Sequence, residues 1–141
     1  MGTLEGKWSA AADGGDVAGI LSRLRDNPRF NVNWTDASLW TALHNASQYG
    51  HVEVVKVLLA HPDINANLKN WRGQTSFSKG CEYARVSVVC GLLKDPRVNI
   101  TLEDNAGRSP LWWASYNGQL EVVEWLITSG RDLGDANGKG K

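Results

Sequence analysis

The tetrapeptide Pro62-Asp63-Ile64-Asn65 has two near-copies in the chain, each displaced from it by 34 positions. The earlier copy is Pro-Arg-Phe-Asn at residues 28–31, and the later copy is Pro-Arg-Val-Asn at residues 96–99. The same spacing links further sets of similar residues, namely Thr41, Thr75 and Ser109; Leu43, Phe77 and Leu111; Gly50, Ala84 and Gly118; and Val54-Val55, Val88-Val89 and Val122-Val123. A period of about 20 to 50 residues is typical of proteins built from stacked repeats. We therefore expect the 141 residues to form one domain of stacked units.

Each unit contains two short segments whose apolar residues have helical spacing. In the second unit these segments are residues 41–49 and 51–60. Gly50 suits the left-handed conformation that ends a helix, and Pro62 ends the second segment because proline cannot continue the backbone hydrogen bonds. The polar residues 65–74 predict a turn or hairpin. Because neither helix can bury its apolar face alone, such units are stable only when they stack.

The second unit contains the motifs Thr41-Ala42-Leu43-His44-Asn45-Ala46, Gly50-His51, Val54-Val55 and Leu58-Leu59. These motifs resemble the Thr-Pro-Leu-His-x-Ala, Gly-His, Val-Val and Leu-Leu pattern of the ankyrin repeat. The resemblance recurs in the fourth unit, is weaker in the third, and is degenerate in the first. It implies an all-α ankyrin-repeat solenoid of helix-turn-helix units over residues 1–133, with repeats at about 4–35, 36–69, 70–103 and 104–133. Residues 134–141 are expected to form a flexible, glycine-rich tail.

The chain departs from the family pattern at several positions. Leu39 replaces the glycine of the second hairpin, which predicts a wider turn there. Ala84 stands where glycine would adopt a left-handed conformation more easily, while Gly80 and Gly91 lie inside predicted helices. Each helical glycine costs about 1 kcal/mol relative to alanine. We therefore expect the third unit to be the least stable.

Composition and motifs disfavour catalysis, metals and charged macromolecular partners. Lys and Arg total 15, as do Asp and Glu, and without a run of like charges we expect no nucleic acid or membrane partner. Cys81 and Cys90 lack metal-site spacing, and the resemblance implies that His44 and His51 tie repeats together through hydrogen bonds. We therefore expect no enzyme activity, metal or cofactor. Without a secretory signal, two reduced cysteines indicate a cytoplasmic or nuclear protein.

Seven tryptophans against two phenylalanines are an unusual ratio for a stack whose core is mostly small and aliphatic. The repeat register places Trp8 and Trp125 toward neighbouring helices, which favours core packing. Trp112 replaces the structural histidine of the motif and is expected to be buried. Trp34 precedes the second hairpin, where packing and partner binding are both open.

The resemblance implies that hairpin tips and first-helix faces line a concave groove. The register places a band of Trp and Tyr there, with Lys79, Glu82 and Asn105 nearby. Near the ends of the first helices it places Tyr49, Tyr83 and, in the fourth unit, Tyr116 or its neighbour Asn117. The predicted partner-binding residues are Trp40, Trp71, Arg72, Gln74, Tyr49, Tyr83, Arg108, Trp113 and Tyr116. Such aromatic residues dominate binding energy at interfaces. We expect a protein or peptide partner, anchored by apolar side chains and oriented by Arg72 and Arg108.

Two other functions stay open. The chain could be a structural slice of a longer array that self-associates through its ends, including weak homo-oligomers formed through an exposed terminal repeat. Alternatively, Trp112, Trp113 and Tyr83, with Glu82 nearby, could form an aromatic cage for a methylated lysine.

Overall fold

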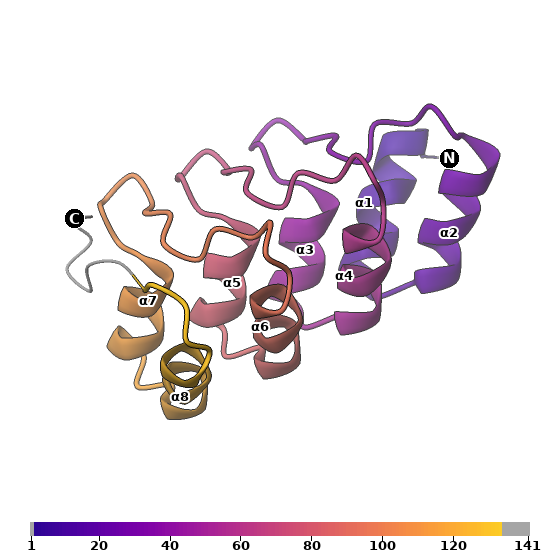
Figure 1. The fold of residues 1–141 in the computed structure, drawn as a ribbon. Helices are drawn as coiled ribbons and strands as arrows, with labels where there is room; N and C mark the ends of the chain where they lie inside the picture. Colours follow the sequence, from indigo (N-terminus) through magenta and orange to yellow (C-terminus); the bar gives the residue numbers. More distant parts are fainter. Residues whose placement is uncertain (1, 134–141) are drawn as a thin grey trace.

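The computed structural model describes residues 2–133, which form eight α-helices and no strand (Figure 1). The helices occur in pairs: α1 (Leu4–Gly14) with α2 (Val17–Asp26), α3 (Ala42–Gln48) with α4 (Val52–Leu59), α5 (Ser76–Glu82) with α6 (Val86–Leu93), and α7 (Pro110–Tyr116) with α8 (Leu120–Thr128). The predicted all-α solenoid is confirmed. The tail predicted for residues 134–141 lies outside the described residues.

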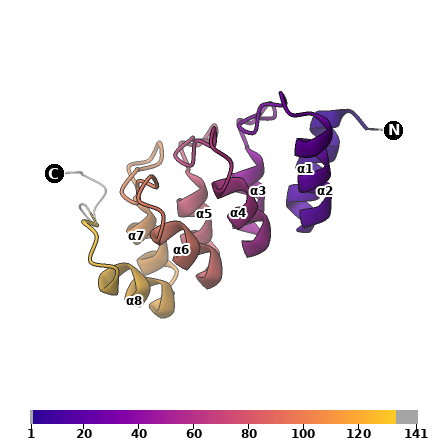
Figure 2. The same cartoon turned by 45° about the vertical axis from the view of Figure 1, so that its right-hand side comes forward.

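The pairs stack side by side, so that the first helices form one row and the second helices form another (Figures 1 and 2). The loops between pairs project from one end of the helices, toward the side of the first row. We call residues 36–40, 70–74 and 104–108 the hairpin tips, because in each the first N–H donates to the carbonyl of the last residue. We call each helix pair, with any hairpin tip before it, a repeat, numbered first to fourth.

Each first helix begins at a hydroxyl side chain. Thr3, Thr41, Thr75 and Ser109 each accept a hydrogen bond from the backbone N–H three residues later, at 2.9–3.1 Å. These caps satisfy donors that the helix itself leaves free. They explain why Thr or Ser recurs at the 34-residue spacing in Thr41, Thr75 and Ser109, whereas Thr3 caps the first helix outside that spacing.

The turn inside each pair requires a left-handed backbone. Gly50 adopts it with φ +75°, and Ala84 adopts it at the equivalent position with φ +56°. Because a Cβ atom disfavours this conformation by about 1–2 kcal/mol, Ala84 carries the cost expected from the sequence.

Leu39 also has a left-handed backbone, with φ +65°, but the prediction of a wider turn there is wrong. The Asp36 N–H donates to the Trp40 carbonyl at 3.1 Å, as Asn70 donates to Gln74 at 2.9 Å in the next tip. The Asp36 carboxylate also accepts hydrogen bonds from the N–H groups of Ser38 and Trp40. These bonds hold the turn to its ordinary width, so the cost is carried by the Leu39 backbone.

The core lies between the two rows of helices. Leu58, Leu92 and Leu126, spaced by 34 residues, are all buried. Trp8 is fully buried, and its ring centroid lies 5.0 Å from that of Phe30, so its predicted core role is confirmed. Trp34 is half-buried against the core, and Trp112 of α7, which was expected to be buried, is only half-buried.

The prediction that Trp125 belongs to the core is wrong. Its side chain is 42% exposed on α8, where it lines a hollow with Val86 and Cys90 of α6. The equivalent residues, Val57 and Gly91, are themselves only half-buried, so this position lies at the edge of the second row. An indole is too large to fit inside that edge.

Within the described residues, no helix is long and apolar enough to cross a membrane.

Backbone hydrogen bonds hold neighbouring hairpin tips together. The Trp71 N–H donates to the Ser38 carbonyl at 3.1 Å, and the Asn105 N–H donates to the Arg72 carbonyl at 2.9 Å. The Asn105 side chain adds a bond to the Trp71 carbonyl at 2.9 Å. The tips therefore form one continuous surface beside the first helices.

Candidate functional site

A hollow of about 390 Å³ lies between the third and fourth repeats, where the two hairpin tips meet α5 and α7. We call it the aromatic pocket. It is lined by Trp71, Arg72, Gln74, Glu82, Asp104, Asn105, Ala106, Arg108 and Trp113. The structure therefore brings together five of the nine residues predicted to bind a partner: Trp71, Arg72, Gln74, Arg108 and Trp113.

Short polar side chains hold the pocket backbone. The Asp104 Oδ1 atom accepts hydrogen bonds from the N–H groups of Ala106 and Arg108, at 3.0 and 2.9 Å. Its Oδ2 atom accepts from the Trp113 indole at 3.1 Å. Asn70 holds the other tip in the same way, through Arg72 and Gln74. The role of Asp104 was not predicted, although Asp or Asn at the start of all three tips is a turn signal that could have revealed it.

Two arginines lie on the indoles of the pocket. The Arg72 guanidinium lies 4.8 Å from the Trp71 ring centroid, and Trp71 is 56% exposed. The Arg108 guanidinium lies 4.7 Å from the Trp112 centroid and 5.5 Å from that of Trp113. Neither arginine forms an ion pair with another residue of the described range 2–133. The pocket thus combines flat apolar surfaces with two positive charges.

Trp40 and Tyr83 form a separate cluster around Lys79, between the second and third repeats. The ammonium nitrogen of Lys79 lies 5.0 Å from the Trp40 ring centroid and 5.4 Å from that of Tyr83. It also lies 3.1 Å from a carboxylate oxygen of Glu82. Lys79 is 6% exposed, so this cation is buried with its partner already present. Burial also raises the pKa of Tyr83 above its usual range.

Tyr116 and Tyr49 lie apart from the aromatic pocket. The Tyr116 ring stacks on Trp112, with centroids 4.7 Å apart and planes at 9°, and is 72% exposed. Tyr49, Tyr83 and Asn117 are the residues that directly follow α3, α5 and α7, so of the two alternatives left open by the sequence it is Asn117, and not Tyr116, that is equivalent to the other two tyrosines. Tyr49 is 49% exposed at the end of α3, with its ring centroid 6.4 Å from that of His51.

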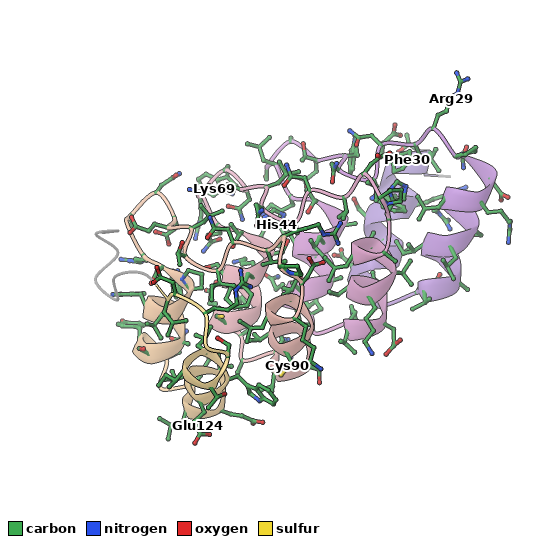
Figure 3. The ribbon with its side chains drawn as sticks, in the orientation of Figure 1. Arg29, Phe30, His44, Lys69, Cys90 and Glu124 are labelled. Carbon is green, nitrogen blue, oxygen red and sulfur yellow. The ribbon has the colours of Figure 1, made fainter. Side chains whose placement is uncertain are left out.

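The two motif histidines join repeats, as the resemblance implied. The His44 Nε2 atom lies 2.8 Å from the Gln74 carbonyl, and the His51 Nε2 atom lies 2.7 Å from the Asp13 carbonyl. His44 lies within the stack (Figure 3), and burial lowers its pKa from 6.5 to about 4. It is therefore neutral at neutral pH. Because the Thr41 N–H donates to Nδ1, the Nε2 atom carries the proton that bonds Gln74.

The cysteines are not placed for nucleophilic or metal chemistry. Both Cys81 and Cys90 are free thiols, and burial raises the pKa of each. A raised pKa keeps a thiol protonated, whereas the thiolate is the reactive and metal-binding form. No group of three or more His, Cys, Asp or Glu side chains in residues 2–133 could hold a metal ion.

The fold and the pocket together define a class, a helical-repeat solenoid with a hollow between two hairpin tips and two first helices. The family assignment follows from two sequence matches. The protein-family model described as ankyrin repeats (3 copies) matches residues 8–104, and the one described as ankyrin repeat matches residues 106–138. The chain therefore belongs to the ankyrin repeat family. This is a non-catalytic interaction fold, whose members generally bind other proteins.

Proposed function

We propose that the chain binds an extended segment of a partner protein through its aromatic pocket. The observation that carries the proposal is the convergence of Trp71 and Trp113 on one hollow with a backbone held by hydrogen bonds. Exposed indoles bury a large area at low entropic cost when a ligand covers them. A pocket of about 390 Å³ is large enough for a few side chains, which suits a peptide segment.

The test uses a peptide selected from a random display library on the full-length chain. Trp71→Ala and Trp113→Ala are each expected to cost more than about 1 kcal/mol of binding free energy, measured by titration calorimetry. Trp125→Ala is the matched control, because this indole is exposed, as that of Trp71 is, but lies on the second row of helices. Losses below about 1 kcal/mol at both pocket residues, or an equal loss for Trp125→Ala, would contradict the proposal.

Self-association is a second candidate, favoured by the outer face of the fourth repeat. Leu120 is 76% exposed there and Ile127 is 64% exposed, whereas the equivalents of Ile127, Leu59 and Leu93, are half-buried and buried. Another repeat or a second copy could cover these side chains. Sedimentation velocity over a dilution series separates the candidates, since a dimer lost in Leu120→Lys/Ile127→Lys supports self-association.

Recognition of methylated lysine is the weakest of the three functions. Arg108 lies over Trp112 and Trp113, and Lys79 lies over Tyr83, so cations of the protein itself already occupy the proposed cage. An added cation would meet like charges. We expect a trimethyl-lysine peptide and its unmodified counterpart to bind equally.

We also propose a cytoplasmic or nuclear location. Both cysteines of the chain are free thiols, which is common in reducing compartments.

A further inference from the structure

We infer that the partner segment places an anionic group against Arg72 and Arg108, beside an apolar residue that packs on the indoles. The inference rests on the proposed function, since it concerns the same pocket. The partner is therefore a segment in which an acidic side chain lies beside an apolar one.

Arg72 and Arg108 differ from most arginines of the described range in having no hydrogen-bond acceptor within it. Eight arginines lie within residues 2–133. Five of them donate to a carbonyl or carboxylate oxygen of the protein: Arg23, Arg25, Arg85, Arg97 and Arg131. Within the described range, the guanidinium groups of Arg29, Arg72 and Arg108 have no such partner. Two of these three line the aromatic pocket.

The two acidic side chains that line the pocket, Asp104 and Glu82, already bind other groups of the protein. Asp104 accepts three hydrogen bonds from N–H groups of its own repeat. Glu82 forms an ion pair with Lys79. The charges of Arg72 and Arg108 are therefore left for a ligand, and a negative group of the partner would neutralise them.

The Arg72 guanidinium lies 4.8 Å from the Trp71 ring centroid, and the Arg108 guanidinium lies 4.7 Å from that of Trp112. None of the N–H groups of these guanidiniums donates to an oxygen within residues 2–133, so these donors can form bidentate bonds to a carboxylate or phosphate. The backbones of Arg72 and Arg108 are fixed by Asn70 and Asp104, so little backbone freedom remains to be lost on binding. The indoles also exclude water from one side of each arginine, which strengthens a charged hydrogen bond.

The experiment compares arginine variants on peptides selected with the full-length wild-type chain. We expect the selected peptides to contain Glu or Asp next to an aromatic or aliphatic residue. Arg72→Gln and Arg108→Gln should each weaken binding roughly tenfold, as expected for a hydrogen bond between charged groups. Arg29→Gln is the matched control, because Arg29 projects into solvent at the far end of the stack (Figure 3). It should leave affinity unchanged.

A second arm changes the peptide. Replacing its Glu by Gln should weaken binding to the wild type by a similar factor, but should have little effect on the Arg72→Gln/Arg108→Gln variant. Replacing the Glu by phosphoserine distinguishes the two sources of negative charge. Tighter binding indicates a phosphorylated partner, and equal or weaker binding indicates a carboxylate.

The outcomes separate the two proposals. Selected peptides that lack acids, or a Glu-to-Gln change with equal effect on the wild type and the double arginine variant, would overturn the anionic group. The proposed function would survive that result if binding still depended on Trp71 and Trp113. Binding that is independent of both tryptophans would overturn the proposed function and this inference together.

Discussion

The interface between the second and third repeats and the interface between the third and fourth repeats use cations and aromatic rings differently. At the first, Lys79 is buried against Trp40 and Tyr83 and is paired with Glu82. At the second, Arg72 and Arg108 lie on exposed or half-buried indoles without an ion-pair partner in residues 2–133. In the first cluster the cation thus already has its ion-pair partner, whereas a ligand could supply the partner that the cations of the second cluster lack within residues 2–133.

The two interfaces also differ in a hydrogen bond between repeats, which is present at the first and absent at the equivalent position of the second within the described residues. His44 joins the second repeat to the third through the Gln74 carbonyl. The equivalent residue one repeat later is Ser78, which is buried and whose hydroxyl has no hydrogen-bond partner within the described part of the chain. The interface beside the aromatic pocket therefore lacks the bridge that stabilises its neighbour.

The sharpest test of this difference compares alanine substitutions at the two equivalent positions. His44→Ala should lower the free energy of unfolding by about 3 kcal/mol, because it creates a cavity and leaves a buried carbonyl without its side-chain donor. Ser78→Ala should change it by less than about 0.5 kcal/mol, because its hydroxyl forms no bond that can be lost. Urea unfolding of both variants measures the difference. Equal losses would show that the two interfaces do not differ in this way.

Acid should weaken the His44 interface. The His44 pKa is about 4 in the folded chain, against 6.5 when unfolded, so between these values the unfolded state binds the proton more strongly. The stabilisation is complete above pH 6.5 and is lost as the pH falls toward 4. At pH 5 the loss amounts to about 2 kcal/mol. Unfolding of the wild type and of His44→Gln between pH 7 and pH 5 checks this. The variant should lose about 2 kcal/mol less, and parallel profiles would contradict the assignment.

The smallest expected effect concerns the third repeat, which both interfaces share and which the sequence predicts to be the least stable. Gly91→Ala should stabilise the chain by about 1 kcal/mol, because a Cβ atom there meets nothing within 4 Å. Gly80→Ala should gain less or lose stability, because its Cβ would lie 3.3 Å from a methyl group of Val89. Thermal unfolding compares the two variants, and hydrogen exchange in α6 reports whether the repeat opens first. Equal gains would show that Gly80 is not required by packing.

The fold could be predicted from the spacing of a few residue types. Pro62 and its two equivalents set the period, while Thr41 and Gly50 mark where the first helix of the second repeat begins and ends. These signals are local, because a helix cap, a left-handed turn and a helix end each depend on neighbouring residues. The exposure of Trp125 could not be predicted in this way, because it depends on how much room the adjacent Gly91 and Cys90 leave at the edge of the second row.

The candidate site was predictable in part. The register placed Trp71, Arg108 and Trp113 on the side where the structure forms a pocket. It did not separate that pocket from the cluster around Lys79, because the rings, cations and acids that meet at each interface are brought together only by the stacking of the repeats. It left Tyr116 and Asn117 both open at the end of α7, and because one position on a helix turns a side chain by about 100°, only the helix end in the structure decides between them.

By itself, the sequence determined the period, the helix boundaries, the family and the joining role of the two motif histidines. Each of these depends on short motifs whose contacts lie within one repeat or between nearest neighbours. Only the tertiary structure decided that Lys79 is neutralised by Glu82, while Arg72 and Arg108 have no ion-pair partner within residues 2–133. The physical reason is that a charge is compensated by whatever lies within a few ångströms of it. That set of neighbours is fixed when the repeats stack and not by spacing along the chain.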